Sequence, residues 1–249
     1  MIDEVGPKTT QAHWDAAWHL SVRRRLPSRL NVNVRDITNL LRRHAKPGDR
    51  YIEIGCAPGK FLAWVAARCK VRAAGLDYSE TGISNCKALA LALALDIELH
   101  QGDFFCHTLP KCSFDVVASF GFIEHFDDRR EAVRRHIELL RPGGKALIGV
   151  PTYAGLYGRL QRLCDPINLT LHNLNIMNPA SLLALVGDAQ VSEARAYPYG
   201  SVSLWLVNLE KRLPQWLAKA IQLAANALGL LQFFTVPVLA PMLVLEIRK

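Results

Sequence analysis

The sequence predicts an α/β protein with a doubly wound, mostly parallel sheet covered by helices on both faces. Two observations carry this prediction. Short apolar runs alternate with longer amphipathic stretches between residues 50 and 150. Turn sequences such as Lys46-Pro47-Gly48-Asp49 and Arg141-Pro142-Gly143 separate these runs. Strands joined by helices of about a dozen residues need right-handed crossovers, which make the strands parallel.

Two helices are expected before the first strand. Residues 8–20 favour a short helix, because Trp14 and Trp18 are four positions apart and share one face. A second helix is expected over residues 30–45, and the turn at Lys46-Pro47-Gly48 ends it. Both helices precede the alternating pattern and therefore form an N-terminal segment, residues 1–46.

The alternating core follows over residues 47–151. Strands are expected at 50–55, 71–76, 97–101, 114–119 and 144–150, with helices at 60–68, 79–95 and 128–140. Residues 152–178 have no clear period and indicate an inserted substrate cap. A helix at 179–186, a strand at 189–196 and a last strand at 243–247 complete a single domain that ends with residues 179–249.

The C-terminal region contains a long uncharged stretch. No charged residue lies between Lys219 and Glu246, but Pro237 and Pro241 interrupt the run, so a helix followed by a strand is favoured over a membrane-spanning helix. Gln215, Lys219, Gln222 and Asn226 form a narrow polar stripe on this helix. Its wide apolar face is expected to pack on the sheet, on a partner or at a membrane surface.

Composition and charge exclude several classes of protein. Half of the 249 residues are hydrophobic and 21% are charged, which argues against disorder. The six cysteines contain no Cys-x-x-Cys pair, so a structural zinc site is not expected. No residue is assigned to a metal, and whether the reaction needs one stays open. Reduced thiols and the absence of a signal-peptide pattern in the first 18 residues predict a cytoplasmic protein.

The net charge of +8 is concentrated in one segment. Residues 21–50 contain nine basic and two acidic residues, a balance of 9 − 2 = +7. Such a segment attracts phosphates, acidic substrates or an anionic membrane, although it can also be a solvated face.

The most informative motif joins the first core strand to its helix. Glu53 ends the strand, and Gly55-Cys56-Ala57-Pro58-Gly59 forms a tight turn of small residues. Glycines allow a sharp turn and a close approach of the backbone to a ligand. The turn lacks the middle glycine of the dinucleotide fingerprint and the Gly-Lys-Ser/Thr of a phosphate loop.

Acidic residues end the next two strands. Asp77 can accept hydrogen bonds from the two ribose hydroxyls of a nucleoside. Asp103 can accept one from an exocyclic amine, and Phe104 can offer a ring face to a purine. With the polar loop after the fourth strand, four strand ends in this order predict a nucleoside site.

This set resembles the class I S-adenosylmethionine-dependent methyltransferases over residues 47–151, and more weakly over 179–249. The resemblance implies a Rossmann-like, seven-stranded sheet with an antiparallel last strand and S-adenosyl-L-methionine as the cofactor. One departure is Ala57-Pro58, where the family more often has Gly-x. The residues that the resemblance places at the cofactor are Glu53, Gly55, Cys56, Ala57, Gly59, Asp77, Tyr78, Asp103, Phe104, Ser119, Phe120 and Gly121.

Three further stretches are similar to small-molecule methyltransferases of the quinone-biosynthesis type. They are residues 123–126, 140–144 and 171–182. The Glu124-His125 loop, the irregular segment 152–178 and the apolar C-terminal helix predict transfer to oxygen of a small lipophilic or aromatic acceptor. His125 is the first candidate for the base and His172 the second, because imidazole accepts protons near neutral pH. Alternatively, these histidines only order their loops, and Glu124 either orients a base or stabilises a helix start.

Two other functions stay open at this stage. The basic segment and the Cys-Ala-Pro-Gly turn fit an RNA methyltransferase, but the Lys-Asp-Lys-Glu set of the ribose methyltransferases is absent, so nucleic acid is an improbable partner. A non-catalytic binding or membrane-associated protein would not need acids at three strand ends. Cys56 is expected to be a buried filler and not a nucleophile.

Overall fold

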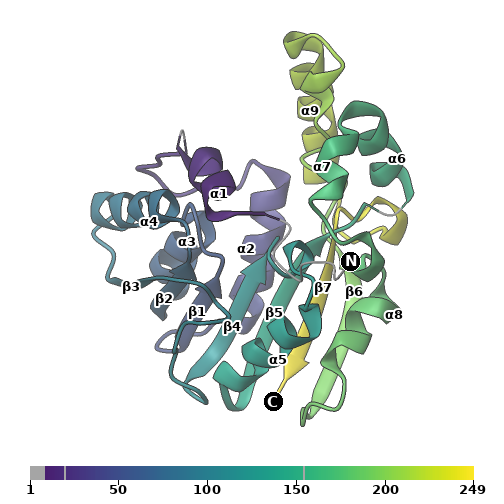
Figure 1. The fold of residues 1–249 in the computed structure, drawn as a ribbon. Helices are drawn as coiled ribbons and strands as arrows, with labels where there is room; N and C mark the ends of the chain where they lie inside the picture. Colours follow the sequence, from purple (N-terminus) through teal and green to yellow (C-terminus); the bar gives the residue numbers. More distant parts are fainter. Residues whose placement is uncertain (1–8, 20, 154) are drawn as a thin grey trace.

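The computed structural model describes residues 9–19, 21–153 and 155–249. Within them, seven strands form one sheet in the order β3-β2-β1-β4-β5-β7-β6 (Figure 1). The strands are β1 (Arg50–Ile54), β2 (Arg72–Asp77), β3 (Ile97–Gln101), β4 (Phe114–Phe120), β5 (Leu140–Pro151), β6 (Glu193–Tyr199) and β7 (Met242–Arg248). The first five are parallel and β7 is antiparallel to both neighbours. The predicted fold class is confirmed.

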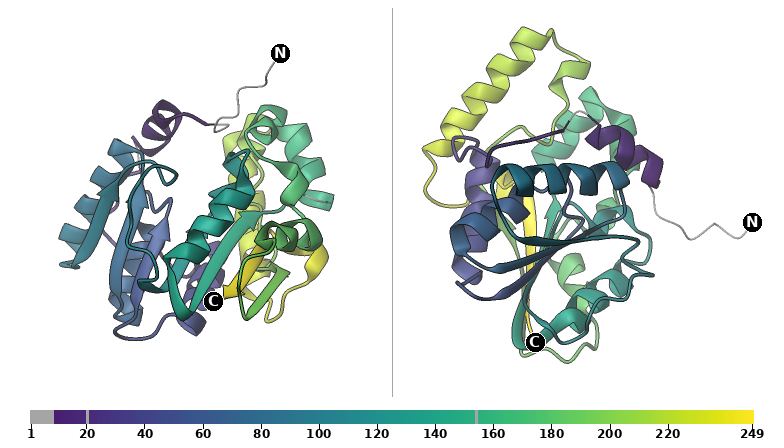
Figure 2. Two further views of the ribbon diagram at one scale, coloured as in Figure 1. Left: turned by 60° about the horizontal axis from the view of Figure 1, so that its bottom comes forward. Right: turned by 90° about the vertical axis from the view of Figure 1, so that its left-hand side faces the viewer.

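Helices cover both faces of this sheet (Figure 2). The α-helices of the described residues, in chain order and including those that do not cover the sheet, are α1 (Gln11–Trp18), α2 (Val32–His44), α3 (Lys60–Cys69), α4 (Glu80–Ala92), α5 (Arg129–Leu139), α6 (Gly155–Cys164), α7 (Pro166–Thr170), α8 (Pro179–Leu183) and α9 (Gln215–Leu230). Short 3-10 turns include η1 (Ile123–His125), η2 (Leu174–Ile176), η3 (Ala184–Val186), η4 (Leu209–Lys211) and η5 (Pro237–Leu239).

Alternating side chains along the strands divide the core into two layers. Tyr51 of β1 packs with α2, α3 and α4, whereas its neighbour Ile52 packs with α5 and α8. Both side chains are fully buried. Burial on both faces explains why the core strands read as nearly continuous apolar runs.

The structure corrects several element boundaries. The helix expected over 79–95 ends at Ala92, because Ala94 adopts a positive φ. The strand expected at 189–196 lies at Glu193–Tyr199, where it pairs with β7. The irregular cap segment contains α6, α7 and η2. Residues 1–8, 20 and 154, which belong to the expected N-terminal segment, first helix and cap, lie outside the described residues.

The predicted C-terminal helix and last strand are present as α9 and β7, and the sequence left the sheet, a partner or a membrane surface open for the apolar face of the helix. Helix α9 does not pack this face on the sheet but projects beyond the carboxyl edge of the parallel strands (Figures 1 and 2). Only Ala218, Ala225 and Gly229 of the helix are buried. In the part of the chain that the structure describes, no helix combines the length and apolar character needed to cross a bilayer.

His136 of α5 provides a test of the core. Its ring is fully buried, Nδ1 lies 2.7 Å from the carbonyl oxygen of Ala132, and Nε2 lies 3.1 Å from Ser119 Oγ. Burial lowers the pKa of His136 to about 4. The unfolded chain therefore binds a proton that the folded chain excludes between about pH 6.5 and pH 4.

We expect the free energy of unfolding to fall as the pH is lowered through this window, by about 3 kcal/mol from His136 alone. The His136→Gln variant should be less stable at pH 7 but should show a flatter dependence on pH. Urea unfolding at pH 7, 6 and 5 measures both slopes. Equal slopes for the two proteins would show that His136 does not carry the effect.

Candidate functional site

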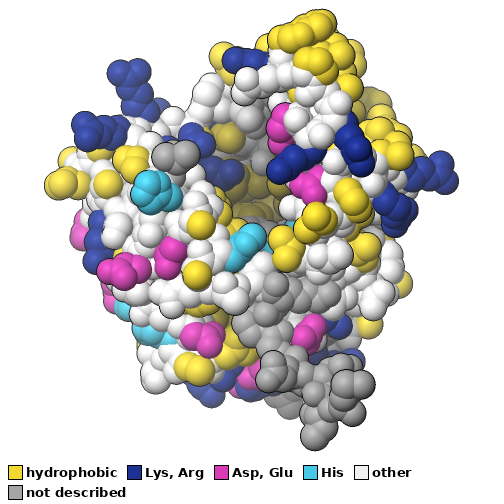
Figure 3. All heavy atoms as spheres, turned by 45° about the horizontal axis from the view of Figure 1, so that its top comes forward, with side chains coloured by type: hydrophobic (Ala, Val, Ile, Leu, Met, Phe, Trp, Pro, Cys, Tyr) yellow, Lys and Arg dark blue, Asp and Glu magenta, His cyan; other side chains and the backbone are white. Residues whose placement is uncertain are grey.

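A cavity of about 540 Å³ lies at the carboxyl edge of the parallel strands. Figure 3 shows the molecule hollowed on this side, with apolar side chains inside the hollow. Most of the residues predicted at the cofactor line it, and so does one predicted base. The predicted residues that line the cavity are Glu53, Gly55, Cys56, Ala57, Asp77, Tyr78, Asp103, Phe104, Phe120, Gly121 and His125.

The turn after β1 forms one wall of the cavity. Gly55 has φ +68°, and a Cβ there would lie 2.6 Å from the Phe122 ring, so only glycine fits. The amides of Gly55 and Cys56 both donate to the carbonyl oxygen of Leu76, at 2.8 and 3.2 Å. The end of β2 therefore fixes the turn.

Asp77 ends β2 and ties the same turn from its side chain. Its Oδ2 accepts a hydrogen bond from the Ala57 amide at 3.0 Å, and its Oδ1 accepts one from the Ser79 amide at 2.9 Å. Burial raises the pKa of Asp77, and these two amide hydrogen bonds oppose the rise. Because a carboxylate has about four lone-pair sites, acceptors remain for the hydroxyls of a ribose.

Asp103 and Phe104 extend the cavity beyond β3. Asp103 is exposed, and its Oδ1 accepts a hydrogen bond from the Phe105 amide at 2.9 Å. Phe104 is buried, with ring centroids 5.5 Å from Phe122 and 5.0 Å from His136. These edge-on contacts make an aromatic wall next to an exposed acid, a surface suited to a purine.

Glu53 places a third acid in the cavity. Burial raises its pKa to about 8, although a hydrogen bond from Tyr51 and the charge of Lys60 oppose the rise. The Tyr51 hydroxyl donates to Glu53 Oε2 at 3.1 Å. Lys60 also lines the cavity, and burial lowers its pKa. A cationic ligand would favour the charged form of Glu53.

Three predicted residues do not line the cavity. Gly59 begins α3 with φ +86°, and a Cβ there would crowd Cys86. Ser119 is fully buried on the opposite face of β4, against His136, so its predicted contact with the donor has no support in the geometry. His172 lies behind His125 and not on the cavity wall.

The N-terminal helix α1 covers part of the cavity. Its Asp15 Oδ1 accepts hydrogen bonds from the Ser79 hydroxyl at 2.6 Å and the Thr81 amide at 3.1 Å, which fasten α1 to the start of α4. Trp14 and Trp18 line the cavity, and the Trp14 ring meets the His125 ring edge-on at 5.2 Å. The aromatic pair that predicted this helix therefore belongs to the site.

Several lining residues had not been identified from the sequence. Arg23, Lys60, Trp205 and Met242 line the cavity together with the residues discussed above. Trp205 and Met242 lie more than 180 positions after Trp14 and Trp18 in the sequence, so no local pattern could have linked them. Lys60 directly follows the glycine turn, and this position could have identified it as a lining residue.

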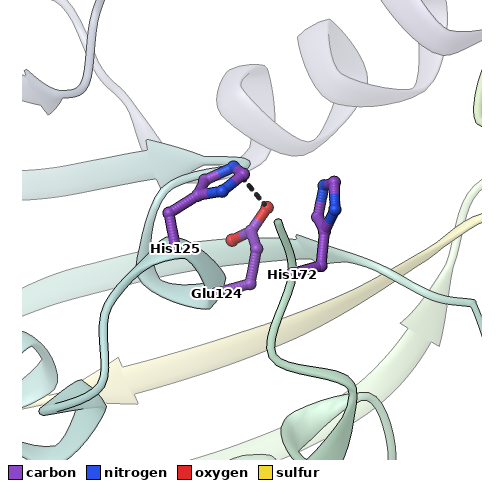
Figure 4. Close-up of side chains that lie close together, drawn as sticks. All are labelled: Glu124, His125 and His172. Carbon is purple, nitrogen blue, oxygen red and sulfur yellow. Dashed lines mark ion pairs between the residues drawn. The ribbon is translucent and has the colours of Figure 1, made fainter. Parts of the chain in front are cut away.

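Glu124, His125 and His172 form a compact cluster beside the cavity (Figure 4). His125 Nε2 lies 3.7 Å from Glu124 Oε1, and the two imidazole centroids are 4.8 Å apart. The amide of Asn173 donates to the Glu124 carbonyl at 2.9 Å, which brings the cap segment to η1. Burial raises the pKa of Glu124 to about 8.

Backbone contacts set the tautomer of both histidines. His125 Nδ1 lies 2.9 Å from the carbonyl oxygen of Leu171, and His172 Nδ1 lies 2.8 Å from that of Asn168. A carbonyl oxygen only accepts, so each neutral ring carries its proton on Nδ1 and has Nε2 as its basic nitrogen. One donor atom from each of the three side chains lies within 4.8 Å of the others, so the cluster could also hold a divalent ion.

Cys56 has the role that its sequence position predicted. Its thiol is buried and lies 4.0 Å from Cys86 Sγ. The hydrogen bond with Cys86 and burial raise the pKa of Cys56 well above its usual range. A thiol held in its neutral form is a poor nucleophile, so Cys56 fills space in the turn.

Comparison with known proteins shows what the chain is similar to. Residues 52–148 match a family described as "Methyltransferase domain". Phosphoethanolamine N-methyltransferase 1 of Arabidopsis thaliana is 33% identical over 103 residues, which are 41% of this chain and 21% of that protein. The 27-O-demethylrifamycin SV methyltransferase of Amycolatopsis mediterranei is 30% identical over 124 residues, 47% of this chain and 46% of that one.

The chain spans between about a fifth and a half of the length of these two relatives. Among solved structures, a SAM dependent methyltransferase from Archaeoglobus fulgidus superposes with a TM-score of 0.57 at 17% identity, covering 86% of this chain and 93% of that one. At that identity the likeness concerns the fold. Motif, fold and family match agree that residues 52–148 are similar to a methyltransferase domain.

Proposed function

We propose that this protein transfers a methyl group from S-adenosylmethionine to a hydroxyl of a small lipophilic or aromatic acceptor. The observation that carries the proposal is the composition of a single cavity. One part contains the acids of three strand ends, Glu53, Asp77 and Asp103. The remaining walls contain aromatic and aliphatic side chains from α1, β4 and the segment before α9, next to His125, together with Arg23, Asp127 and Asp128.

The acid-lined part suits a donor that carries positive charge. S-adenosylmethionine supplies an electrophilic methyl group on its sulfonium, and the chain has to hold the donor and exclude water. Asp77 and Asp103 are placed to accept hydrogen bonds from ribose and base. Trp14 and Trp18 cover the site, which limits access of water from the side of α1.

The histidine cluster suits the removal of a hydroxyl proton. His125 lines the cavity, and its Nε2 accepts the proton of the acceptor as the oxygen attacks. The imidazolium that forms lies 3.7 Å from Glu124 and favours the charged form of this carboxyl, which burial otherwise disfavours. The His172 ring packs against the His125 ring. Because His172 Nδ1 is bound to the carbonyl oxygen of Asn168, the His172 ring is held in place and can position His125. His125 is thus the proposed base, and His172 a positioning residue.

The lining disfavours a phosphorylated amine as acceptor. A phosphate group needs several cationic donors around it. Of the described residues that line the cavity, Arg23 and Lys60 are the basic ones, and Lys60 interacts with Glu53. Methylation of phosphoethanolamine, the activity in the name of one relative, is therefore the second choice in an acceptor panel.

The basic segment gives little support to an RNA substrate. Arg35, from the middle of that segment, donates to Ser201 Oγ at 2.7 Å and to the carbonyl oxygen of Leu230 at 2.9 Å. Arg50 lies over the Phe114 ring at 5.2 Å. Arg35 and Arg50 therefore contribute to the fold and are not free to bind nucleic acid.

We also propose a cytoplasmic location, because the six cysteines of the chain are free thiols.

Replacing Asp77 or Asp103 by asparagine should weaken donor binding. Loss of a charge-assisted hydrogen bond costs about 1.5–3 kcal/mol, which corresponds to a Kd about 10- to 100-fold higher. Isothermal titration with S-adenosylmethionine measures the Kd. Glu98→Gln is the matched control, because Glu98 is an exposed acid of β3 outside the cavity. Unchanged donor affinity in both aspartate variants would refute the assignment of the site.

Donor affinity should also depend on pH through Glu53. The charged carboxylate binds a cation more tightly than the neutral acid, so affinity should rise with pH up to about 8, the pKa of Glu53 in the free protein. Titrations at pH 6, 7 and 8 should show this rise, and Glu53→Gln should remove it. A rise that persists in Glu53→Gln would assign the effect to another group.

Replacing His125 by glutamine should lower kcat by about 100-fold or more, with donor Kd unchanged, because general bases contribute rate and not donor binding. His172→Gln should lower kcat less, and Glu124→Gln should lower it without abolishing binding. The assay is methyl transfer from labelled donor to a panel of phenols, catechols and amines.

The same assay separates proton transfer from metal chemistry. Under our proposal a chelator leaves kcat unchanged. Activity that is lost with a chelator and restored by Mg²⁺ or Zn²⁺ would assign the cluster to metal binding instead. A His125→Gln variant with full activity on hydroxyl acceptors would exclude His125 as the base.

A further inference from the structure

Most of the exposed residues of α9 are apolar. Nine residues of the helix and its C-cap are exposed; Gln215 and Lys219 are polar, and the other seven are apolar. The apolar ones are Trp216, Ala220, Leu223, Ala224, Ala227, Leu228 and Leu231, the last at the C-cap. Trp216 and Leu231 are each 72% exposed. A helix of 16 residues is about 24 Å long, so these side chains form an extended apolar strip.

The opposite face of α9 explains this orientation. Asn226 Oδ1 accepts a hydrogen bond from the Val32 amide at 2.8 Å, and its Nδ2 donates to the Leu30 carbonyl at 2.8 Å. A Cβ on Gly229 would lie 2.3 Å from the Val202 carbonyl oxygen, so the backbones approach closely there. Asn226, Ala225 and Gly229 thus face the protein, whereas Trp216, Leu223, Leu228 and Leu231 face outward.

Neighbouring segments extend the apolar surface. Phe233 and Phe234 follow the helix and are 95% and 73% exposed. On α6 and α7, Leu163 and Ile167 are also exposed, and Arg212 Nε donates to the Leu163 carbonyl at 2.9 Å, which links α6 to the start of this region. Figure 3 shows the gathered apolar side chains over α9.

Basic residues accompany this surface. Between residues 201 and 240 the chain carries Lys211, Arg212 and Lys219, all exposed, against the single acid Glu210. Arg159 and Arg162 on α6 are also exposed. A strip of Trp, Leu and Phe flanked by Lys and Arg is complementary to a bilayer whose surface is negatively charged.

We propose that α9, with Phe233 and Phe234, docks this protein on anionic membrane surfaces. The helix lies in the plane of the interface with Trp216, Leu223 and Leu231 inserted, and the lysines and arginines contact lipid phosphates. A second copy of the chain is the less suitable occupant. Two copies that meet through this face would bring like charges together, in a protein of net charge +8.

The docking surface lies next to the cavity, so an acceptor could enter the cavity from the membrane. Trp205 lines the cavity, is 43% exposed and lies in the segment that leads to α9. An apolar acceptor dissolved in the bilayer would therefore meet apolar side chains from the membrane to His125. This extension rests on the proposed function, whereas the docking itself does not.

Sedimentation with vesicles tests the docking on the full chain. The vesicles are phosphatidylcholine with and without phosphatidylglycerol. We expect binding that requires phosphatidylglycerol and weakens with salt. Replacing both Phe233 and Phe234 by serine should lower the partition coefficient about tenfold or more. Lys219→Glu should also lower the partition coefficient, and this loss should shrink as salt is raised.

The matched control is Leu91→Ser, because Leu91 is 84% exposed on α4, away from α9. It should bind vesicles as the unaltered protein does. Methylation of a water-soluble acceptor should be the same in all these proteins, which separates failure of docking from failure of the proposed function.

Three results would overturn the docking proposal. One is the absence of vesicle binding. Another is binding that Phe233→Ser/Phe234→Ser leaves unchanged. The third is a stable dimer in light scattering that the double variant dissociates, with no affinity for vesicles, which would assign the face to a second copy.

Discussion

The hydrogen bond between the Ala57 amide and the Asp77 carboxylate joins the two strand ends on which the site depends. β1 and β2 are paired so that Ile54 lies beside Leu76, and the turn that leaves β1 is bound to the Leu76 carbonyl oxygen as well. The turn and the acid therefore move as one unit. Burial makes the charged carboxylate costly, and the amide donors offset part of that cost, so the acid is held ready for a ligand.

The core could be predicted because each of its elements is specified locally. Apolar runs, glycine turns and strand-end acids lie close together in sequence, and parallel topology brings strand ends to one edge. Ser119 was predicted at the cofactor together with Phe120 and Gly121, as if all side chains at the end of β4 faced the same way. Side chains alternate along a strand, so Phe120 faces the cavity while Ser119 faces α5. Alternation was available in the sequence and would have corrected this.

Other features depended on contacts between distant segments. Nothing near His172 in sequence indicates that it would lie against His125, since the contact follows from the bond between the Asn173 amide and the Glu124 carbonyl. For α9, the period revealed two unlike faces but not which would be buried. Packing on the sheet, the usual arrangement for surface helices, was one of three alternatives left open for the larger apolar face. That face is directed outward because Asn226, on the opposite face, binds the Val32 amide of α2 and the Leu30 carbonyl before α2.

Some helices do not belong to the alternating strands and helices of the core, and they are inserted next to the proposed acceptor side of the cavity. α6, α7 and η2 lie between β5 and α8, and α9 lies between β6 and β7. Tyr157 of α6 and Ala218 of α9 belong to one small apolar cluster, separate from the two layers of the sheet. A cluster of this size cannot bury the rest of α9, so the large side chains of the helix remain outward. Trp205, in the segment before α9, lines the cavity and is partly exposed, so the cavity reaches the outer surface near this helix.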